Sequence, residues 1–70
     1  MNGIGFVIKK LRIQKGLTQK NIYHNLCSRK QLSRIENNIS YPSIYLLYNI
    51  CQKLDVSMDE VIHLTIEDTN

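Results

Sequence analysis

The chain has 70 residues, 43% of them hydrophobic, and a formal net charge of +3. Residues 1–34 contain eight lysines and arginines and no acid, whereas residues 35–70 contain one lysine and six acids. This composition allows one small folded domain, and it excludes a disordered chain, a transmembrane helix of about 18 apolar residues and a signal peptide, so we expect a cytoplasmic protein. The segregated charge is typical of a protein with one face that meets a polyanion, although a solvated surface with chance placement of charge is the alternative.

The first half of the chain predicts three short helices. Helical spacing of apolar residues begins the first helix at Ile4, Val7, Ile8 and Leu11, and Gly16 suits the position after its end. Thr18 is a good N-cap for a second helix, whose apolar face contains Ile22, Tyr23 and Leu26. Ser28 is the cap of a third helix, with Leu32 and Ile35 on its buried side, and the pair Asn37–Asn38 can take the left-handed conformation that ends it.

The second half predicts two more helices. Pro42 and Ser43 open a fourth helix with a broad apolar arc of Ile44, Leu47, Tyr48, Ile50, Cys51 and Leu54. The sequence Ser57-Met58-Asp59-Glu60 matches a capping box and begins a fifth. The helical signal fades beyond Leu64, so we predict a domain over residues 1–64 and a frayed tail or the start of a linker over 65–70. The fold class is all-α, a compact bundle of four or five short helices.

The second and third predicted helices are joined by a tight turn, which indicates a helix-turn-helix. With Leu32 at the centre of the buried face, the outer face of the third helix carries Lys30, Ser33 and Arg34. Arg29 and Gln31 lie on the flanks near its N-terminus, the end that a recognition helix inserts into the major groove. Arginine and lysine can donate to guanine, and glutamine can pair with adenine. By itself this face fits DNA recognition or an ordinary solvated surface.

Glu36 departs from this outward pattern, because it lies only about 40° from Leu32 on a helical projection. A buried carboxylate requires a partner, since an unpaired buried charge costs several kcal/mol. Arg12, at the edge of the apolar arc of the first helix, is the best candidate. We therefore predict a structural ion pair between Arg12 and Glu36.

Three motifs resemble those of the Cro/phage-repressor (XRE) helix-turn-helix family: LRIQKGLTQ at 11–19, SRIENN at 33–38 and YPSIYLLYNICQKLDVSMDEV at 41–61. The resemblance covers roughly residues 4–64 and implies a lambda-repressor-like fold that binds double-stranded DNA through the third helix, in a transcriptional regulator without enzymatic activity. Two departures are Asn38, where the family has glycine, and a turn before Ser28 that is one residue shorter, which leaves the register of Arg29 against the bases open.

The resemblance also implies the DNA contacts. It places Gln19 at a phosphate or a base edge, Asn37 at the backbone, and the family's Arg–Glu core pair on Arg12 and Glu36. Tyr41 either donates its hydroxyl to a phosphate or caps the fourth helix. The expected DNA-binding residues are Gln19, Lys20, Ser28, Arg29, Lys30, Gln31, Ser33, Arg34, Asn37 and Tyr41.

The stretch LCSRKQLSRIEN looks closest to the Rgg/PlcR branch, which comprises peptide-sensing (quorum-sensing) regulators. That resemblance implies a larger, dimeric regulator with a palindromic operator, in which a following helical-repeat domain supplies dimerisation and peptide binding. Phe6 and Ile13 lie away from the core arc of the first helix and are candidates for such an interface, or for ordinary exposed residues. Two alternatives remain: a small stand-alone phage-type repressor, and a protein-interaction module that keeps the fold without binding DNA.

Catalytic and metal sites have no support in the sequence. His24, Cys27, Cys51 and His63 do not have the paired spacing of structural zinc ligands, and no nucleophilic triad or phosphate loop is present. We therefore expect no enzyme, no metal and no cofactor. Cys27 is predicted to be a small buried residue rather than a redox sensor. Tyr23 and Tyr48 are predicted in the core and Tyr45 on the surface, so the aromatic residues do not form a single-strand-binding platform.

Overall fold

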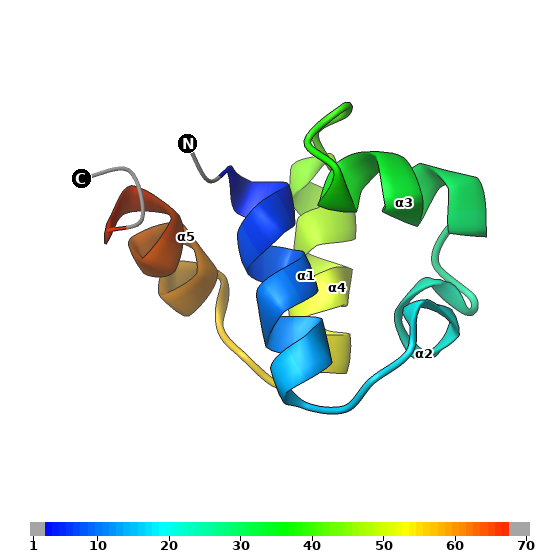
Figure 1. Cartoon of the computed structure of the whole chain (residues 1–70), viewed down its shortest axis with the longest axis horizontal. Coiled ribbons are helices and arrows are strands. Elements are labelled where there is room, and N and C mark those ends of the chain that lie inside the picture. Colours follow the sequence, from blue (N-terminus) through cyan, green and yellow to red (C-terminus); the bar gives the residue numbers. More distant parts are fainter. Residues whose placement is uncertain (1–2, 68–70) are drawn as a thin grey trace.

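A computed structural model describes residues 3–67 and contains five α-helices and, within that range, no strand. The helices are α1 (Ile4–Gln14), α2 (Gln19–Tyr23), α3 (Arg29–Glu36), α4 (Ile44–Leu54) and α5 (Met58–Glu67) (Figure 1). The prediction of an all-α bundle of short helices is confirmed.

Side-chain caps begin four of the helices at the predicted residues. The hydroxyl of Thr18 accepts a hydrogen bond from the backbone N–H of Asn21 over 3.1 Å, and the Asn21 side chain accepts from the Thr18 N–H in return. The hydroxyls of Ser28, Ser43 and Ser57 each accept a hydrogen bond from the backbone N–H of the residue three positions later. These bonds satisfy N–H groups that have no partner within the helix, so the boundaries follow from local chemistry.

Within residues 3–67, four residues have the left-handed backbone conformation, and two of them were predicted. Gly16 (φ 70°) follows α1 and Asn38 (φ 59°) follows α3, as expected. Asn25 (φ 64°), in the turn between α2 and α3, and Asp55 (φ 57°), which ends α4, were not anticipated. Asparagine and aspartate tolerate this conformation better than other non-glycine residues.

The C-terminal helix extends beyond the predicted boundary at Leu64, because residues 65–67 continue α5. The Thr65 hydroxyl donates to the backbone carbonyl of Val61 over 2.8 Å, and Thr65 and Leu64 are half-buried. Residues 65–67 thus belong to α5, and residues 68–70 of the predicted tail lie outside the described residues.

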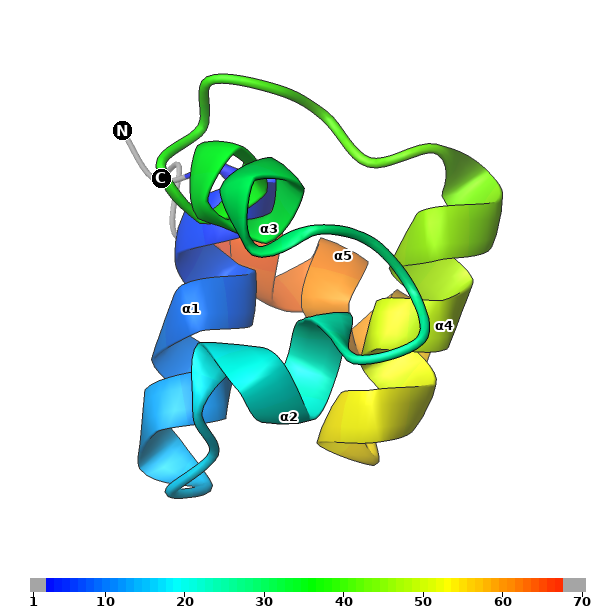
Figure 2. The ribbon, with the colours of Figure 1, turned by 90° about the vertical axis from the view of Figure 1, so that its right-hand side faces the viewer.

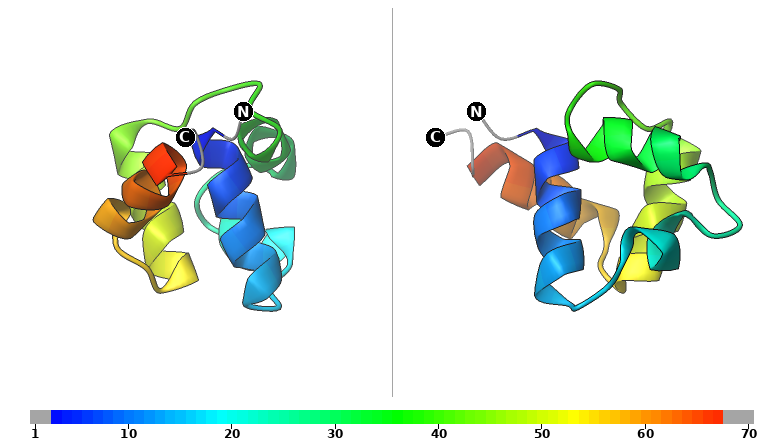
Figure 3. Two further views of the ribbon diagram at one scale, coloured as in Figure 1. Left: turned by 60° about the vertical axis from the view of Figure 1, so that its left-hand side comes forward. Right: turned by 45° about the vertical axis from the view of Figure 1, so that its right-hand side comes forward.

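The core lies where the five helices meet. In Figure 1, α2 and α3 occupy one end of the long axis and α5 the other, and the views in Figure 3 show α5 beside α1 and α4. Helix α3 packs on α1 and α2, α2 packs on α4, and α5 packs on α1 and α4. The buried apolar residues are Val7, Ile8, Leu11, Ile22, Leu32, Ile35, Leu47, Ile50, Cys51, Leu54 and Val61.

The buried face of α4 is narrower than predicted. Leu47, Ile50, Cys51 and Leu54 are buried, but Ile44 and Tyr48 are exposed, so their predicted place in the core was wrong. The main contacts of α4 are with α2 and α5, and these two neighbours cover only part of its broad apolar arc. Tyr23 is half-buried and packs against the core, whereas Tyr45 is exposed as expected.

Helices α1 and α3 lie in close backbone contact at Gly5. A Cβ built on Gly5 would collide with the backbone carbonyl oxygen of Ile35. The Gly5 N–H donates to the side-chain oxygen of Asn38 over 3.2 Å. The missing side chain of Gly5 thus permits the contact that fixes the C-terminal end of α3 against α1.

None of the helices in residues 3–67 combines the length and the apolar character needed to cross a membrane.

Candidate nucleic-acid interface

A buried ion pair joins α1 to α3. The Nε of Arg12 donates to Oε2 of Glu36 over 2.7 Å, and its Nη2 donates to Oε1 over 3.1 Å. The two side chains are 11% and 1% exposed. The two parallel bonds match the planar guanidinium to the carboxylate, which is the strong geometry for such a pair. The structure thus places Arg12 and Glu36 together, as their positions on the two helix faces predicted.

The same pair also positions α2. The remaining terminal nitrogen of Arg12, Nη1, donates to the carbonyl of Leu17 over 3.0 Å, and Leu17 directly precedes Thr18, the N-cap of α2. The side-chain amide of Gln19 donates to Glu36 Oε1 over 3.1 Å and to the Ser33 hydroxyl over 3.2 Å. Helices α1, α2 and α3 are therefore linked through the hydrogen bonds of one ion pair, Arg12 with Glu36.

Gln19 and Ser33 were predicted to contact DNA, and the structure gives both a different environment. Ser33 is half-buried against α2 rather than on the outer face of α3, because it accepts the hydrogen bond from Gln19. The two amide hydrogens of Gln19 are used within the protein. Its side chain cannot donate to a phosphate without breaking one of these bonds. The role of Gln19 in holding α2 against α3 had no signal in the sequence.

The outer face of α3 carries the predicted bases. Arg29, Lys30, Gln31 and Arg34 are all exposed, and Figure 2 shows the N-terminal end of α3 directed out of the molecule above α2. Within residues 3–67, ion pairs join only Arg12 with Glu36 and His63 with Glu67. The bases of α3 are thus not neutralised by a carboxylate of the described chain, and the helix presents a positive surface.

The other predicted contact residues are also exposed. Lys20, Ser28 and Asn37 are exposed, in the first turn of α2, at the N-cap of α3 and at its C-cap. Tyr41 is 84% exposed in the segment before α4. The possibility that Tyr41 caps α4 was wrong, because the hydroxyl of Ser43 accepts the hydrogen bond from the Leu46 N–H.

Lys53 was not predicted as a site residue, because it is the one base of the acidic half of the chain. The structure brings it next to α2, where its Nζ donates to the carbonyl of His24 over 2.9 Å. In Figure 2 the last turn of α4 lies beside the end of α2. Only the tertiary fold unites this lysine with the basic half.

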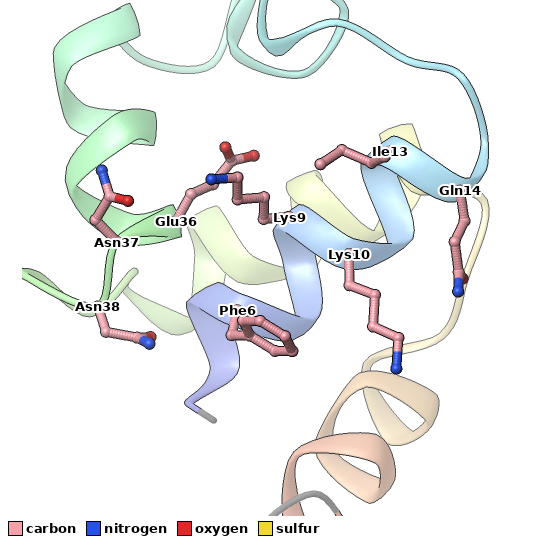
Figure 4. Close-up of a pocket in the computed structure, with 8 residues that line it drawn as sticks. All are labelled: Phe6, Lys9, Lys10, Ile13, Gln14, Glu36, Asn37 and Asn38. Carbon is pink, nitrogen blue, oxygen red and sulfur yellow. The ribbon is translucent and has the colours of Figure 1, made fainter. Parts of the chain in front are cut away.

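A groove that contains two exposed apolar side chains lies along α1, next to the C-terminal end of α3. Phe6 is 40% exposed and Ile13 is 58% exposed, two helical turns apart, as their spacing predicted. They border a groove of about 490 Å³ between α1 and the end of α3. Figure 4 shows Lys9 directed toward Glu36 and Lys10 toward α5, on the two sides of Phe6.

Both cysteine thiols are shielded from solvent, one fully and one in part. Cys51 is buried and Cys27 is half-buried against the core. Burial raises the pKa of both cysteines above the ordinary value, and the Glu60 carboxylate raises the pKa of Cys51 further. A raised pKa leaves less thiolate at neutral pH, which disfavours nucleophilic and redox roles. Among residues 3–67, no three metal-ligating side chains lie close enough together to hold an ion.

Comparison with known proteins identifies one matching family model and several similar solved structures. The family model described as Helix-turn-helix matches residues 8–61. The wild-type restriction-modification controller protein C.Esp1396I superposes with a TM-score of 0.81 at 33% identity, over 94% of this chain and 87% of that chain. PlcR of Bacillus thuringiensis, solved in complex with the peptide PapR7 and DNA, superposes with a TM-score of 0.80 at 37% identity, over 89% of this chain and 22% of that chain.

The clp gene regulator ClgR of C. glutamicum superposes with a TM-score of 0.89 over 96% of this chain and 88% of that chain. Its identity is 24%, so the likeness shows a shared fold. No curated protein sequence matches the chain at a significant level.

Proposed function

Because this chain belongs to the helix-turn-helix family of the Cro/phage-repressor (XRE) type, we infer that it is a DNA-binding transcriptional regulator and not an enzyme. We propose that α3 enters the major groove and reads bases there. The observation that carries this proposal is the exposed outer face of α3. Its bases Arg29, Lys30 and Arg34 form no ion pair with any carboxylate of residues 3–67. Two relatives were solved in relevant complexes: C.Esp1396I as a nucleoprotein complex, and PlcR with DNA.

The roles of the residues on this surface differ by position. Arg34, Lys30 and Gln31 project from α3 and can donate to base edges, whereas Lys20 is on the first turn of α2, outside the helix that enters the groove, and is assigned to the DNA backbone. The buried network of Arg12, Gln19 and Glu36 holds α2 and α3 in one relative position, so the reading side chains are preorganised.

Binding of duplex DNA should depend steeply on salt, and this tests the proposed function directly. Each phosphate contact that releases a counterion adds about 0.9 to the slope of log affinity against log salt. The measurement is fluorescence anisotropy with a labelled duplex between low and moderate salt. Affinity that stays flat over this range would instead support a protein-interaction module.

Base reading and phosphate binding should respond differently to mutation. Arg34→Ala and Lys30→Ala should each weaken binding to a sequence selected from random DNA by about 1–3 kcal/mol, with less effect on unselected DNA. Lys20→Ala should weaken both kinds of DNA alike, and it serves as the matched control. An equal loss on both kinds of DNA for Arg34→Ala would remove the base-contact assignment.

We further propose that the chain acts on a palindromic operator as a dimer. One recognition helix covers few base pairs, so specificity requires two half-sites about 34 Å apart. The likeness to PlcR supports a peptide-responsive regulator in which another domain supplies the dimer, and the apolar pair Phe6 and Ile13 supplies a docking surface for it. The second candidate is a small stand-alone regulator, which the match over 87% of C.Esp1396I favours.

The oligomeric state distinguishes these two candidates. If another domain supplies the dimer, the 70-residue chain should sediment as a monomer or a weak dimer at micromolar concentration and should protect its operator only at high concentration. A stable dimer that protects a palindrome at nanomolar concentration would identify the stand-alone regulator.

A further inference from the structure

Lys53 marks a second basic region away from α3. It is the single base after residue 34, and it lies in the last turn of α4. Its ammonium group donates to the backbone carbonyl of His24, the C-cap of α2, over 2.9 Å. An ammonium group has three donors, so this bond fixes its position and leaves two donors for a ligand.

The region around Lys53 is a shallow hollow of about 400 Å³ lined by Lys20, Asn21, His24 and Lys53. All four residues are exposed, and none of them carries a carboxylate. Lys20 and His24 are four residues apart, so they lie on one face across a turn of the helix. The hollow thus presents two ammonium groups, a carboxamide and an imidazole, all of which can donate hydrogen bonds to an anion.

Lys20 links the hollow to the proposed DNA surface. Gln19, the residue before Lys20, is bonded to Ser33 of α3, so the first turn of α2 lies beside the recognition helix. Lys20 therefore belongs both to the lining of the hollow and to the turn of α2 that adjoins α3.

We propose that this hollow binds a backbone phosphate of the duplex that flanks the bases read by α3, with Lys53 as its principal contact. The inference rests on the proposed function and extends the DNA surface from α2 and α3 to the last turn of α4. Backbone phosphate is favoured over an acidic protein partner because the hollow is small, polar and lined by point charges, and because Lys20 adjoins the helix that reads DNA. The tether to His24 places the lysine without an ion pair that DNA would have to displace.

The test is Lys53→Gln in the full chain, with wild-type protein measured in parallel. On a duplex of random sequence, the slope of log affinity against log salt should fall by about 0.9, as for the loss of one phosphate contact. On a sequence selected from random DNA, phosphate ethylation interference should lose one position outside the bases protected by α3, while base protection stays unchanged. Lys53→Arg keeps the charge and the donors, so it should retain the slope.

Lys10→Gln is the control with the same charge change, because Lys10 projects from α1 toward α5 (Figure 4). It should leave the interference pattern intact and alter the slope less than Lys53→Gln does. All variants are compared below their melting transitions, so a loss of the tether to α2 cannot be mistaken for a lost contact. If Lys53→Gln matches Lys10→Gln in both measurements while wild type binds duplex steeply, the hollow does not bind phosphate and the proposed function stands. If wild type does not bind duplex at all, the proposed function itself fails.

Discussion

Replacing Glu36 by glutamine should lower the free energy of unfolding by about 3–5 kcal/mol, because it leaves the buried guanidinium of Arg12 without its counter-charge. The Glu36 side chain is 1% exposed and accepts bonds from both Arg12 and Gln19. An amide in its place would also direct N–H groups toward other donors. For a domain of this size, such a loss corresponds to a fall of at least about 12 °C in the melting temperature.

Thermal and chemical denaturation followed by circular dichroism measure this effect. Glu60→Gln, which removes an exposed carboxylate from the first turn of α5, is the matched control and should cost no more than about 1 kcal/mol. Replacing both Arg12 and Glu36 by apolar residues should recover part of the stability lost by either single change, since it removes both buried charges. A melting temperature for Glu36→Gln within a degree or two of wild type would mean that the pair does not support the fold.

The second large effect is expected for Gly5→Ala. A Cβ at Gly5 would overlap the carbonyl oxygen of Ile35, which is backbone and cannot rotate away. Helices α1 and α3 would have to separate, which should cost about 1–3 kcal/mol or more. The higher helix propensity of alanine, worth about 1 kcal/mol, would offset only part of this loss. Because α3 is displaced, DNA affinity should fall together with stability.

Gly16→Ala separates this clash from general effects of losing a glycine. Gly16 has φ of 70° and no atom within 4 Å of an added Cβ, so only backbone strain is expected. Its cost should be about 1–2 kcal/mol, with DNA binding otherwise preserved. Denaturant titrations of the two variants, with duplex binding measured on the folded fraction, test this contrast. A Gly5→Ala protein as stable as wild type would show that α1 and α3 can separate at no cost.

The sequence predicted the helix starts well because a cap acts over only three residues. Thr18, Ser28, Ser43 and Ser57 each bond to a nearby backbone N–H, so no distant part of the chain is needed to recognise them. The pairing of Arg12 with Glu36 was also accessible, because helical periodicity places a carboxylate near the core and a buried charge requires a partner.

Contacts between helices were beyond the reach of periodicity. Ser33 is half-buried because it bonds to Gln19, and Tyr48 is exposed because no neighbouring helix covers it. Which helix covers a given face cannot be read from the sequence of that helix alone. The role of Gly5 depends on the carbonyl of Ile35, thirty residues away in the chain.

The amino-acid sequence by itself determined an all-α fold of short helices, four of them begun by side-chain caps, and a basic outer face on the third helix, because these depend on local hydrogen bonds and on helical spacing. The tertiary structure alone decided which polar side chains form hydrogen bonds within the protein and which are left to bind a ligand. Gln19 is turned inward to Glu36, and Lys53 is brought from the acidic half to the carbonyl of His24. Both outcomes depend on helix packing, in which burial of apolar faces brings together polar groups that lie far apart in the sequence.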